Sequence, residues 1–215
     1  MPIKQTGHPM HQERETASEP HAEESANSAE REYPERISKE AINQLPRAVY
    51  DGEIQVVNDL DEARRAAETL AAARLLGFDT ETRPAFKPGV SYSPSLIQLA
   101  THECVYLFQV QQIGTLAPLI PILENEAIIK AGIAIHDDIK ALKSMHAFEP
   151  AGFCDIADHT SPLGIINTGL RPLFAIFLGK RISKGAQVTN WARPQLKPAQ
   201  ITYAATDAWA SRELY

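Results

Sequence analysis

Acidic side chains in three separate segments are the residues of this chain best suited to chemistry. Asp79 and Glu81 end an apolar run. Asp138 precedes an apolar helical pattern, and Asp207 follows Tyr203 by four residues. If these carboxylates meet at the edge of one hydrophobic core, their mutual repulsion and lost hydration require a counter-charge. Divalent cations that prefer oxygen ligands, such as Mg²⁺ or Mn²⁺, meet that requirement.

The spacing of Asp79 and Glu81 predicts a shared face. Residues i and i+2 of a strand project to the same side, so the two carboxylates would lie next to each other. A purely structural role is the alternative, with Asp79 capping a turn and Glu81 pairing with Arg83.

Tyr203 and Asp207 are one helical turn apart and therefore share a helix face. The small residues between them allow that helix to lie close to a sheet. A phenol beside a water molecule can orient it, although an ordinary pKa of about 10 argues against a simple general base. A packed tyrosine that hydrogen-bonds to Asp207 is the alternative.

The segment from His136 to Leu142 reads as the start of a helix. Asp137 is assigned a capping role, because carboxylates stabilise free N–H groups at helix N-termini. Asp138 precedes Ile139 and lies four residues before Leu142, which places it nearer the core, and we assign it to the site. His136 is expected to support the site or lie on the surface, because hard cations prefer oxygen.

Hydrophobic periodicity and turn residues indicate the elements that carry these side chains. Strands are expected at 53–57, 75–80, 95–100, 105–108 and 128–135, with Ile156 in a short further strand. Helices are expected at 38–45, 59–74, 115–123, 137–146 and 170–178, and from 198 to the end. This order predicts an α/β fold with a mixed sheet of about five to six strands flanked by helices.

Length and composition favour one domain with a tail. The 215 residues can form one medium domain with a substantial core. Residues 1–35 are rich in Glu, Ser, Ala and Pro and poor in aliphatic residues, which predicts a disordered acidic tail. We therefore place the folded domain at 36–215.

The chain has no long apolar run and no apolar stretch near Met1, so neither a membrane span nor a secretory signal is expected. Cys104 and Cys154 form no metal or redox motif, and two buried thiols are the expectation. These features favour a soluble, cytoplasmic protein.

Charge is unevenly distributed. Residues 1–40 contain nine Glu and five Lys or Arg, so they account for most of the net charge of −6. No acidic residue occurs from His159 to Thr206, and this stretch contains Arg171, Lys180, Arg181, Lys184, Arg193 and Lys197. The stretch predicts a local positive field. A solvated face with counter-charges from other segments is the alternative.

Taken in order, the three acidic segments resemble the DEDD superfamily of 3′-to-5′ exonucleases. The likeness is to the ribonuclease D-like branch with tyrosine in the third motif (DEDDy). The first motif matches at 77–81 and continues at 94–100, and the second matches at 132–142. The third matches at 200–208, preceded by Asn190 and Trp191. The resemblance extends over about residues 75–215.

The resemblance implies a ribonuclease H-like fold and a site for two Mg²⁺ or Mn²⁺ ions. By it, Asp79 would contact both ions, Glu81 and Asp207 the first, and Asp138 the second. Tyr203 would position the nucleophile. The implied reaction releases nucleoside 5′-monophosphates from the 3′ end of single-stranded RNA or DNA.

The basic stretch would hold the substrate in this picture. Lys180, Arg181, Lys184 and Arg193 could contact the backbone of a single strand. For Trp191 we favour core packing over base stacking. The alternative function is a nucleic-acid-binding or docking module whose nuclease chemistry is dormant.

Overall fold

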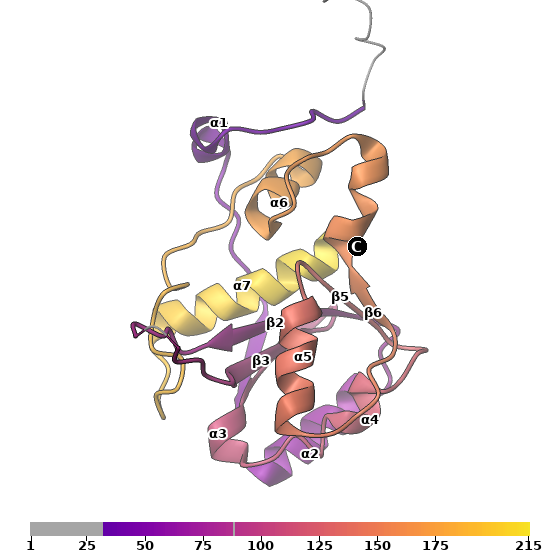
Figure 1. Cartoon of the computed structure of the whole chain (residues 1–215), viewed down its shortest axis with the longest axis vertical. Helices are drawn as coiled ribbons and strands as arrows, with labels where there is room; N and C mark the ends of the chain where they lie inside the picture. Colours follow the sequence, from indigo (N-terminus) through magenta and orange to yellow (C-terminus); the bar gives the residue numbers. More distant parts are fainter. Residues whose placement is uncertain (1–31, 88) are drawn as a thin grey trace, which may run out of the picture. The chain divides into compact units, whose positions relative to one another are not determined.

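The computed structural model describes residues 32–87 and 89–215, and its central element is a mixed six-stranded sheet (Figure 1). The strand order is β1-β4-β3-β2-β5-β6. Strands β2, β3 and β4 form an antiparallel meander, while β1 runs parallel to β4, β5 to β2 and β6 to β5. The strands are β1 (Glu53–Val57), β2 (Leu75–Thr82), β3 (Pro94–Ala100), β4 (Cys104–Gln109), β5 (Ile129–Gly132) and β6 (Phe153–Asp155).

Helices cover both faces of the sheet. They are α1 (Lys39–Gln44), α2 (Leu60–Leu70), α3 (Val110–Ile113), α4 (Ile120–Leu123), α5 (His136–Met145), α6 (Leu170–Leu178) and α7 (Pro198–Leu214). Helix α7 packs on one face, and α2, α4 and α5 pack on the other (Figure 1). Helix α6 packs against the outer side of α7. Two 3₁₀ helices, Ile156–His159 and Ser161–Leu163, follow β6.

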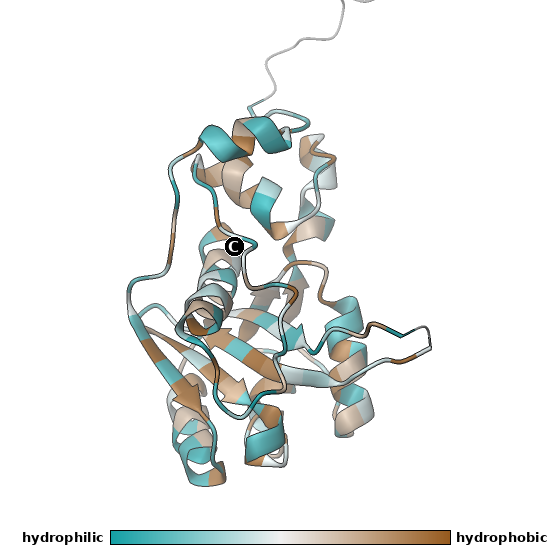
Figure 2. Cartoon of the chain, turned by 90° about the vertical axis from the view of Figure 1, so that its left-hand side faces the viewer, coloured by the Kyte–Doolittle hydropathy of each residue, from teal (hydrophilic) through white to brown (hydrophobic). Residues whose placement is uncertain are grey.

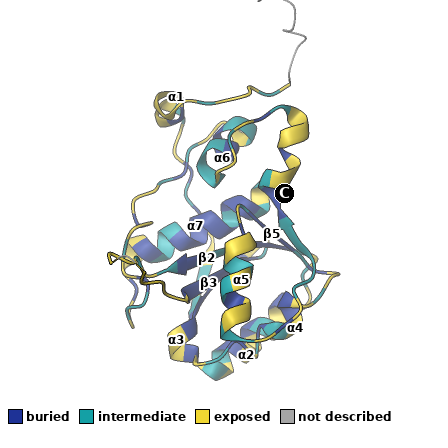
Figure 3. Cartoon of the chain, in the orientation of Figure 1, coloured by how far each residue is buried: buried dark blue, intermediate teal, exposed yellow. Residues whose placement is uncertain are grey.

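Alternation along β2 separates two cores. Leu76 and Phe78 belong to the cluster that includes α2 and α5, whereas the intervening Gly77 faces α7. A Cβ atom at Gly77 would lie 1.9 Å from the carbonyl oxygen of Ala208. The middle of α7 is correspondingly buried (Figure 3), and this part of the helix consists mainly of small residues. Only glycine on β2 allows α7 to approach so closely.

The helices and the cysteines were compared with what the composition of the chain predicts. Figure 2 shows both hydrophilic and hydrophobic residues along the helices. Among the residues that the structure describes, none of the helices combines the length and the apolar character needed to cross a bilayer. Both cysteines are free thiols, with Cys104 buried and Cys154 half-buried.

The α/β fold class and the sheet of five to six strands are confirmed, with six strands present. Expected boundaries differ in several places. The helix expected at 115–123 is wrong in its first half, because only Ile120–Leu123 is helical and a separate turn forms at Val110–Ile113. Pro121 lacks a backbone N–H and is tolerated only in the first turn, which places the helix start here.

Other elements end earlier than expected. The helix expected at 59–74 ends at Leu70, because the chain must turn before it enters β2. The strand expected at 128–135 ends at Gly132, and Ile156 begins a 3₁₀ helix instead of lying in a strand. The disordered tail expected at 1–35 falls mostly on residues 1–31, which lie outside the described residues.

Candidate active site

Three of the four predicted carboxylates come together where β2 meets α7. Asp79 and Glu81 project from β2 on the same face as Gly77, and Asp207 projects from α7. Oxygen atoms of Asp79, Glu81 and Asp207 lie within 4.8 Å of one another. The i, i+2 spacing on the strand and the close approach of α7 at Gly77 produce this cluster.

Asp138 lies beside this cluster in the first turn of α5. Its carboxylate accepts a hydrogen bond from the hydroxyl of Thr80, the residue that follows Asp79. The charge of Asp138 contributes to raising the pKa of both Asp79 and Glu81. Asp138 is therefore within electrostatic range of the cluster. Asp137 is exposed in the same helical turn. The capping role expected for it is wrong, because Ile135 is the N-cap and Asp137 lies inside the helix, where its charge is favourable.

Tyr203 packs between the carboxylates and a buried tryptophan. Its hydroxyl donates a hydrogen bond to Asp207. The ring centroids of Tyr203 and Trp191 are 6.0 Å apart. Trp191 is 1% exposed, which confirms the expectation of core packing. The aromatic pair fixes the phenol at the edge of the site.

Burial and mutual repulsion raise the carboxyl pKa values. Burial, and then the charges of Asp207 and Asp138, hold the pKa of Asp79 well above its ordinary value. Burial, together with the neighbouring acids, raises the pKa of Glu81 to about 10. Burial raises the pKa of Asp207 to about 7, although its hydrogen bond from Tyr203 and the charge of Lys184 oppose the shift. Without a counter-ion, these groups cannot all ionise at neutral pH.

The donor set fits a hard divalent cation. Carboxylate oxygens are the ligands that Mg²⁺ and Mn²⁺ prefer. A cation held by Asp79, Glu81 and Asp207 would offset the repulsion that raises their pKa values. Asp138 is not one of the acids whose oxygens lie within 4.8 Å of one another, and its carboxylate is hydrogen-bonded to Thr80.

A cavity of about 300 Å³ opens at the cluster. Asp79, Glu81, Tyr203 and Asp207 form one wall, and the start of α6 with the segment after it forms the other. That second wall contains residues that the sequence did not single out for the site: Arg171, Ser183 and Gln187. The acid-free composition of this stretch was the only sequence signal for them.

The predicted substrate-contacting residues differ in position. Lys184 is exposed, lines the cavity and lowers the pKa of Asp207. Lys180 is exposed. Arg181 is half-buried, and its Nε donates to the carbonyl of Leu45 at 3.0 Å, which ties it to the segment after α1. Arg193 is half-buried, and its carbonyl accepts a hydrogen bond from Gln109.

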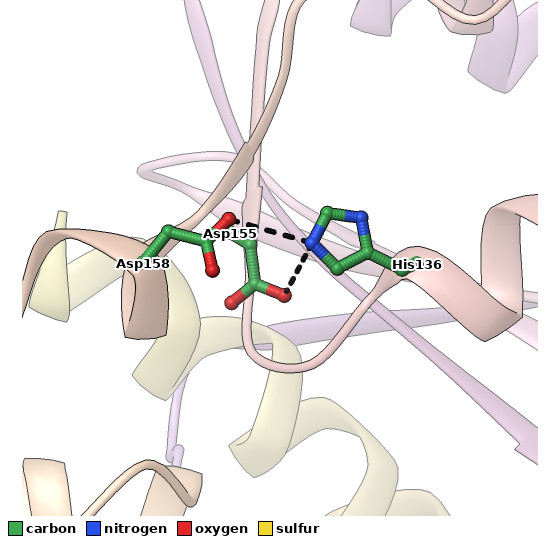
Figure 4. Close-up of side chains that lie close together, drawn as sticks. All are labelled: His136, Asp155 and Asp158. Carbon is green, nitrogen blue, oxygen red and sulfur yellow. Dashed lines mark ion pairs between the residues drawn. The ribbon is translucent and has the colours of Figure 1, made fainter. Parts of the chain in front are cut away.

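A second polar cluster, His136, Asp155 and Asp158, lies at the start of α5 (Figure 4). Nε2 of His136 is 3.7 Å from Asp155 and 3.4 Å from Asp158. The buried Asp155 carboxylate accepts backbone N–H groups of Ala134, Ile135 and Ala157 at 3.0–3.1 Å. These bonds identify Asp155 as a cap for the chain entering α5. His136 is an exposed residue paired with this cap.

Comparisons with known proteins identify a family to which this chain is similar. Residues 54–215 match the model of the 3′-5′ exonuclease family. The chain is 28% identical to the exonuclease mut-7 homolog of Aedes aegypti over 191 residues, 77% of this chain and 26% of that protein. It is 29% identical to ribonuclease D of Cronobacter turicensis over 152 residues, 69% of this chain and 40% of that protein.

A solved structure shows the same fold. The EXO domain of Aedes aegypti Nibbler aligns with a TM-score of 0.71 at 23% identity, covering 78% of this chain and 89% of that one. This chain therefore belongs to the 3′-5′ exonuclease family of the DEDD superfamily. The predicted family and ribonuclease H-like fold are confirmed. The chain spans less than half the length of the two relatives named above.

Proposed function

We propose that residues 36–215 form a metal-dependent exonuclease domain of the tyrosine (DEDDy) branch. The domain would hydrolyse the terminal phosphodiester bond at the 3′ end of single-stranded nucleic acid and release nucleoside 5′-monophosphates. One observation carries the proposal. Carboxylates from β2 and α7, distant in sequence, lie within 4.8 Å of one another at a cavity that Tyr203 and Lys184 also line; Glu81 and Asp207 are buried and Asp79 is half-buried.

The proposed site would hold two Mg²⁺ or Mn²⁺ ions through Asp79, Glu81, Asp207 and Asp138. When bound, such ions stabilise charge on the entering and leaving oxygens of a phosphodiester displacement. The role proposed for Tyr203 is positional. Burial, and then the charge of Asp207 and the hydrogen bond to it, raise the pKa of Tyr203, so its hydroxyl stays protonated and orients the attacking water. Lys184 at the cavity would attract the substrate phosphate.

The first experiment asks whether the chain shortens nucleic acid from the 3′ end. A single-stranded oligonucleotide labelled at its 5′ end is incubated with the full chain and Mn²⁺. We expect a ladder of products, each one nucleotide shorter than the last, and nucleoside 5′-monophosphates as the released species. Matched RNA, single-stranded DNA and duplex substrates then identify the preferred strand.

Two aspartate variants provide the control. Asp79→Asn should reduce cleavage by at least about 10²-fold, the scale expected when one electrostatic contact in a catalytic site is lost. Asp137→Asn changes an exposed carboxylate of the same type and should retain cleavage. Equal product from wild type and Asp79→Asn would leave only a nucleic-acid-binding or docking module with dormant chemistry.

A further inference from the structure

Gln98 in the middle of β3 is fully buried and lacks a hydrogen-bond partner. Its side chain is 0% exposed. Neither the amide nitrogen nor the amide oxygen is hydrogen-bonded to any residue that the structure describes. Buried polar groups in native proteins are normally paired, because an unpaired one loses its hydration without compensation. Gln98 is therefore an unusual buried side chain whose amide is free to pair with a neighbouring polar group.

The residues around Gln98 leave few possibilities. Gln98 is directly opposite Asp79 on β2 and Leu107 on β4. Residues directly opposite in an antiparallel pair have Cβ atoms about 5 Å apart on the same face. Along β3, the neighbours on that face are Leu96 and Ala100, both in the core that α7 covers. Asp79 is thus the one polar side chain directly opposite Gln98 among the described strands.

The diagonal neighbours do not change this conclusion. Gln109 on β4 is also buried, but its amide nitrogen already donates to the carbonyls of Arg193 and Pro194. Glu81, diagonal on β2, belongs to the carboxylate cluster itself. Among the neighbours on β2 and β4, the polar side chains that remain for Gln98 are therefore Asp79 and Glu81 of the candidate active site.

Asp79 has capacity for another donor. Its Oδ1 accepts the backbone N–H of Thr80 at 2.9 Å. A carboxylate offers about four acceptor positions, so sites remain for a cation and for a second N–H donor.

We propose that Gln98 is a positioning residue that donates its amide N–H to Asp79 when the carboxylate holds a divalent cation. The inference rests on the proposed function, because it takes Asp79 to be a cation ligand. A carboxylate is a stronger hydrogen-bond acceptor than a neutral group, and Asp79 lies directly opposite the unpaired amide, so it is the favoured acceptor for the Gln98 N–H. Hydrogen bonds of this kind fix the orientation of metal ligands in other proteins.

The test separates cation binding from folding. Mn²⁺ affinity is measured from the electron paramagnetic resonance signal of free Mn²⁺, without nucleic acid, and Tm is measured in EDTA. Gln98→Met retains the length of the side chain and removes its hydrogen-bonding groups. We expect its Tm in EDTA to equal or exceed that of wild type, because an unpaired amide has been removed. We expect its Mn²⁺ dissociation constant to increase by about 10-fold or more.

Gln109→Met is the matched control, since it makes the same change at a buried glutamine whose amide is paired. It should lower Tm by about 2–5 °C and leave Mn²⁺ affinity within about twofold of wild type. Gln98→Leu provides a second variant for the case in which the methionine side chain of Gln98→Met changes the packing of the core.

Each outcome decides the inference. A folded Gln98→Met or Gln98→Leu protein that binds Mn²⁺ as wild type does would overturn it. A drop in the EDTA Tm like that of Gln109→Met would also overturn it, because Gln98 would then have a structural partner such as an enclosed water. If the wild-type chain binds Mn²⁺ and cleaves oligonucleotides, the proposed function stands even when one of these two results overturns the role of Gln98. A wild-type chain that neither binds Mn²⁺ nor cleaves removes both.

Discussion

Asp79, Glu81 and Asp207 are crowded together at the edge of the core, and their chemistry follows from that crowding. Burial is the first cause of the raised pKa of each group. Their spacing in the sequence indicated the strand face and the helix face separately. Whether the three carboxylates meet depends on how α7 is placed on the sheet. Neither the i, i+2 spacing on the strand nor the i, i+4 spacing on the helix determines that placement.

The stability of the metal-free protein should depend on pH through these carboxyls. The unfolded chain releases their protons near pH 4, whereas folded Asp207 and Glu81 hold theirs to about 7 and about 10. The folded state thus binds more protons in this range, and the free energy of unfolding decreases as pH rises. From pH 5 to 8 in EDTA we expect a loss on the order of a few kcal/mol.

Thermal unfolding in EDTA and in Mg²⁺ at pH 5, 6, 7 and 8 measures this effect. The stabilisation by Mg²⁺ should increase with pH, because a cation favours the ionised carboxylates. Glu81→Gln should show a shallower decline in EDTA. A constant difference between EDTA and Mg²⁺ across this range would contradict the prediction.

Tyr203 should act through its hydroxyl as a positioning group. Tyr203→Phe should lower kcat by about 10²-fold, the scale of a misplaced reacting group, with little change in KM. The fall arises because the variant lacks the hydrogen bond to Asp207 and the contact proposed for water. Steady-state kinetics on a labelled oligonucleotide give both constants.

The pH profile of kcat provides the second readout for Tyr203. Since its raised pKa keeps the phenol protonated, Tyr203→Phe should retain both limbs of the wild-type profile at a lower height. The lost hydrogen bond to Asp207 should raise the pKa of that carboxyl, so a limb that reports Asp207 should move to higher pH. A limb that disappears in the variant would show instead that the phenol titrates during the reaction.

At the scale of elements, the approach of α7 to β2 determines the site. A methyl group at Gly77 would meet the backbone of Ala208, which cannot rotate away as a flexible side chain could. Gly77→Ala should therefore shift α7 outward and lower the free energy of unfolding by about 1–3 kcal/mol. It should also weaken Mn²⁺ binding, because Asp207 moves with the helix.

Gly169→Ala provides a matched control for this change. The added Cβ there would lie 3.6 Å from Pro172, an ordinary contact. Denaturant unfolding should place this variant within about 0.5 kcal/mol of wild type. Equal stability of the two variants would mean that the contact between β2 and α7 is looser than the structure indicates.

Patterns within short segments predicted most of the helices and strands of this fold. Contacts between segments distant in the sequence could not be predicted. The strand carrying Asp79 and the helix carrying Asp207 could be predicted because periods of two and 3.6 residues are local properties. The burial of Gln98 could not, because it depends on the register between β2 and β3 and on the covering helix. Arg171 and Gln187 were missed as cavity residues for the same reason, since the sequence does not show how α6 faces the sheet.

At the scale of the whole molecule, the net charge of the chain and the charge of the segment after α5 that borders the site have opposite signs. The chain carries −6 overall, yet the segment from His159 to Thr206 contains no acidic residue. Lys184 from this segment reaches the cavity. A negatively charged strand would therefore be repelled by the chain as a whole and attracted by this basic segment beside the site.

Cleavage at low substrate concentration should consequently decrease with ionic strength. The logarithm of kcat/KM should fall linearly with the logarithm of salt concentration, and Lys184→Ala should reduce the slope by about one. Lys143→Ala is the control, because that lysine lies at the end of α5 and pairs with Glu149 at 3.7 Å. The same slope in all three proteins would rule out Lys184 as a phosphate contact.

The position of α7 in the chain also matters during translation. The ribosome makes every strand of the sheet before it makes Pro198–Leu214, and this late segment supplies both Asp207 and the cover over one sheet face. A nascent chain halted before Asp207 has an exposed sheet face and an incomplete set of acids. On the proposed mechanism, the domain therefore acquires its full set of acids only when almost all of it has been synthesised.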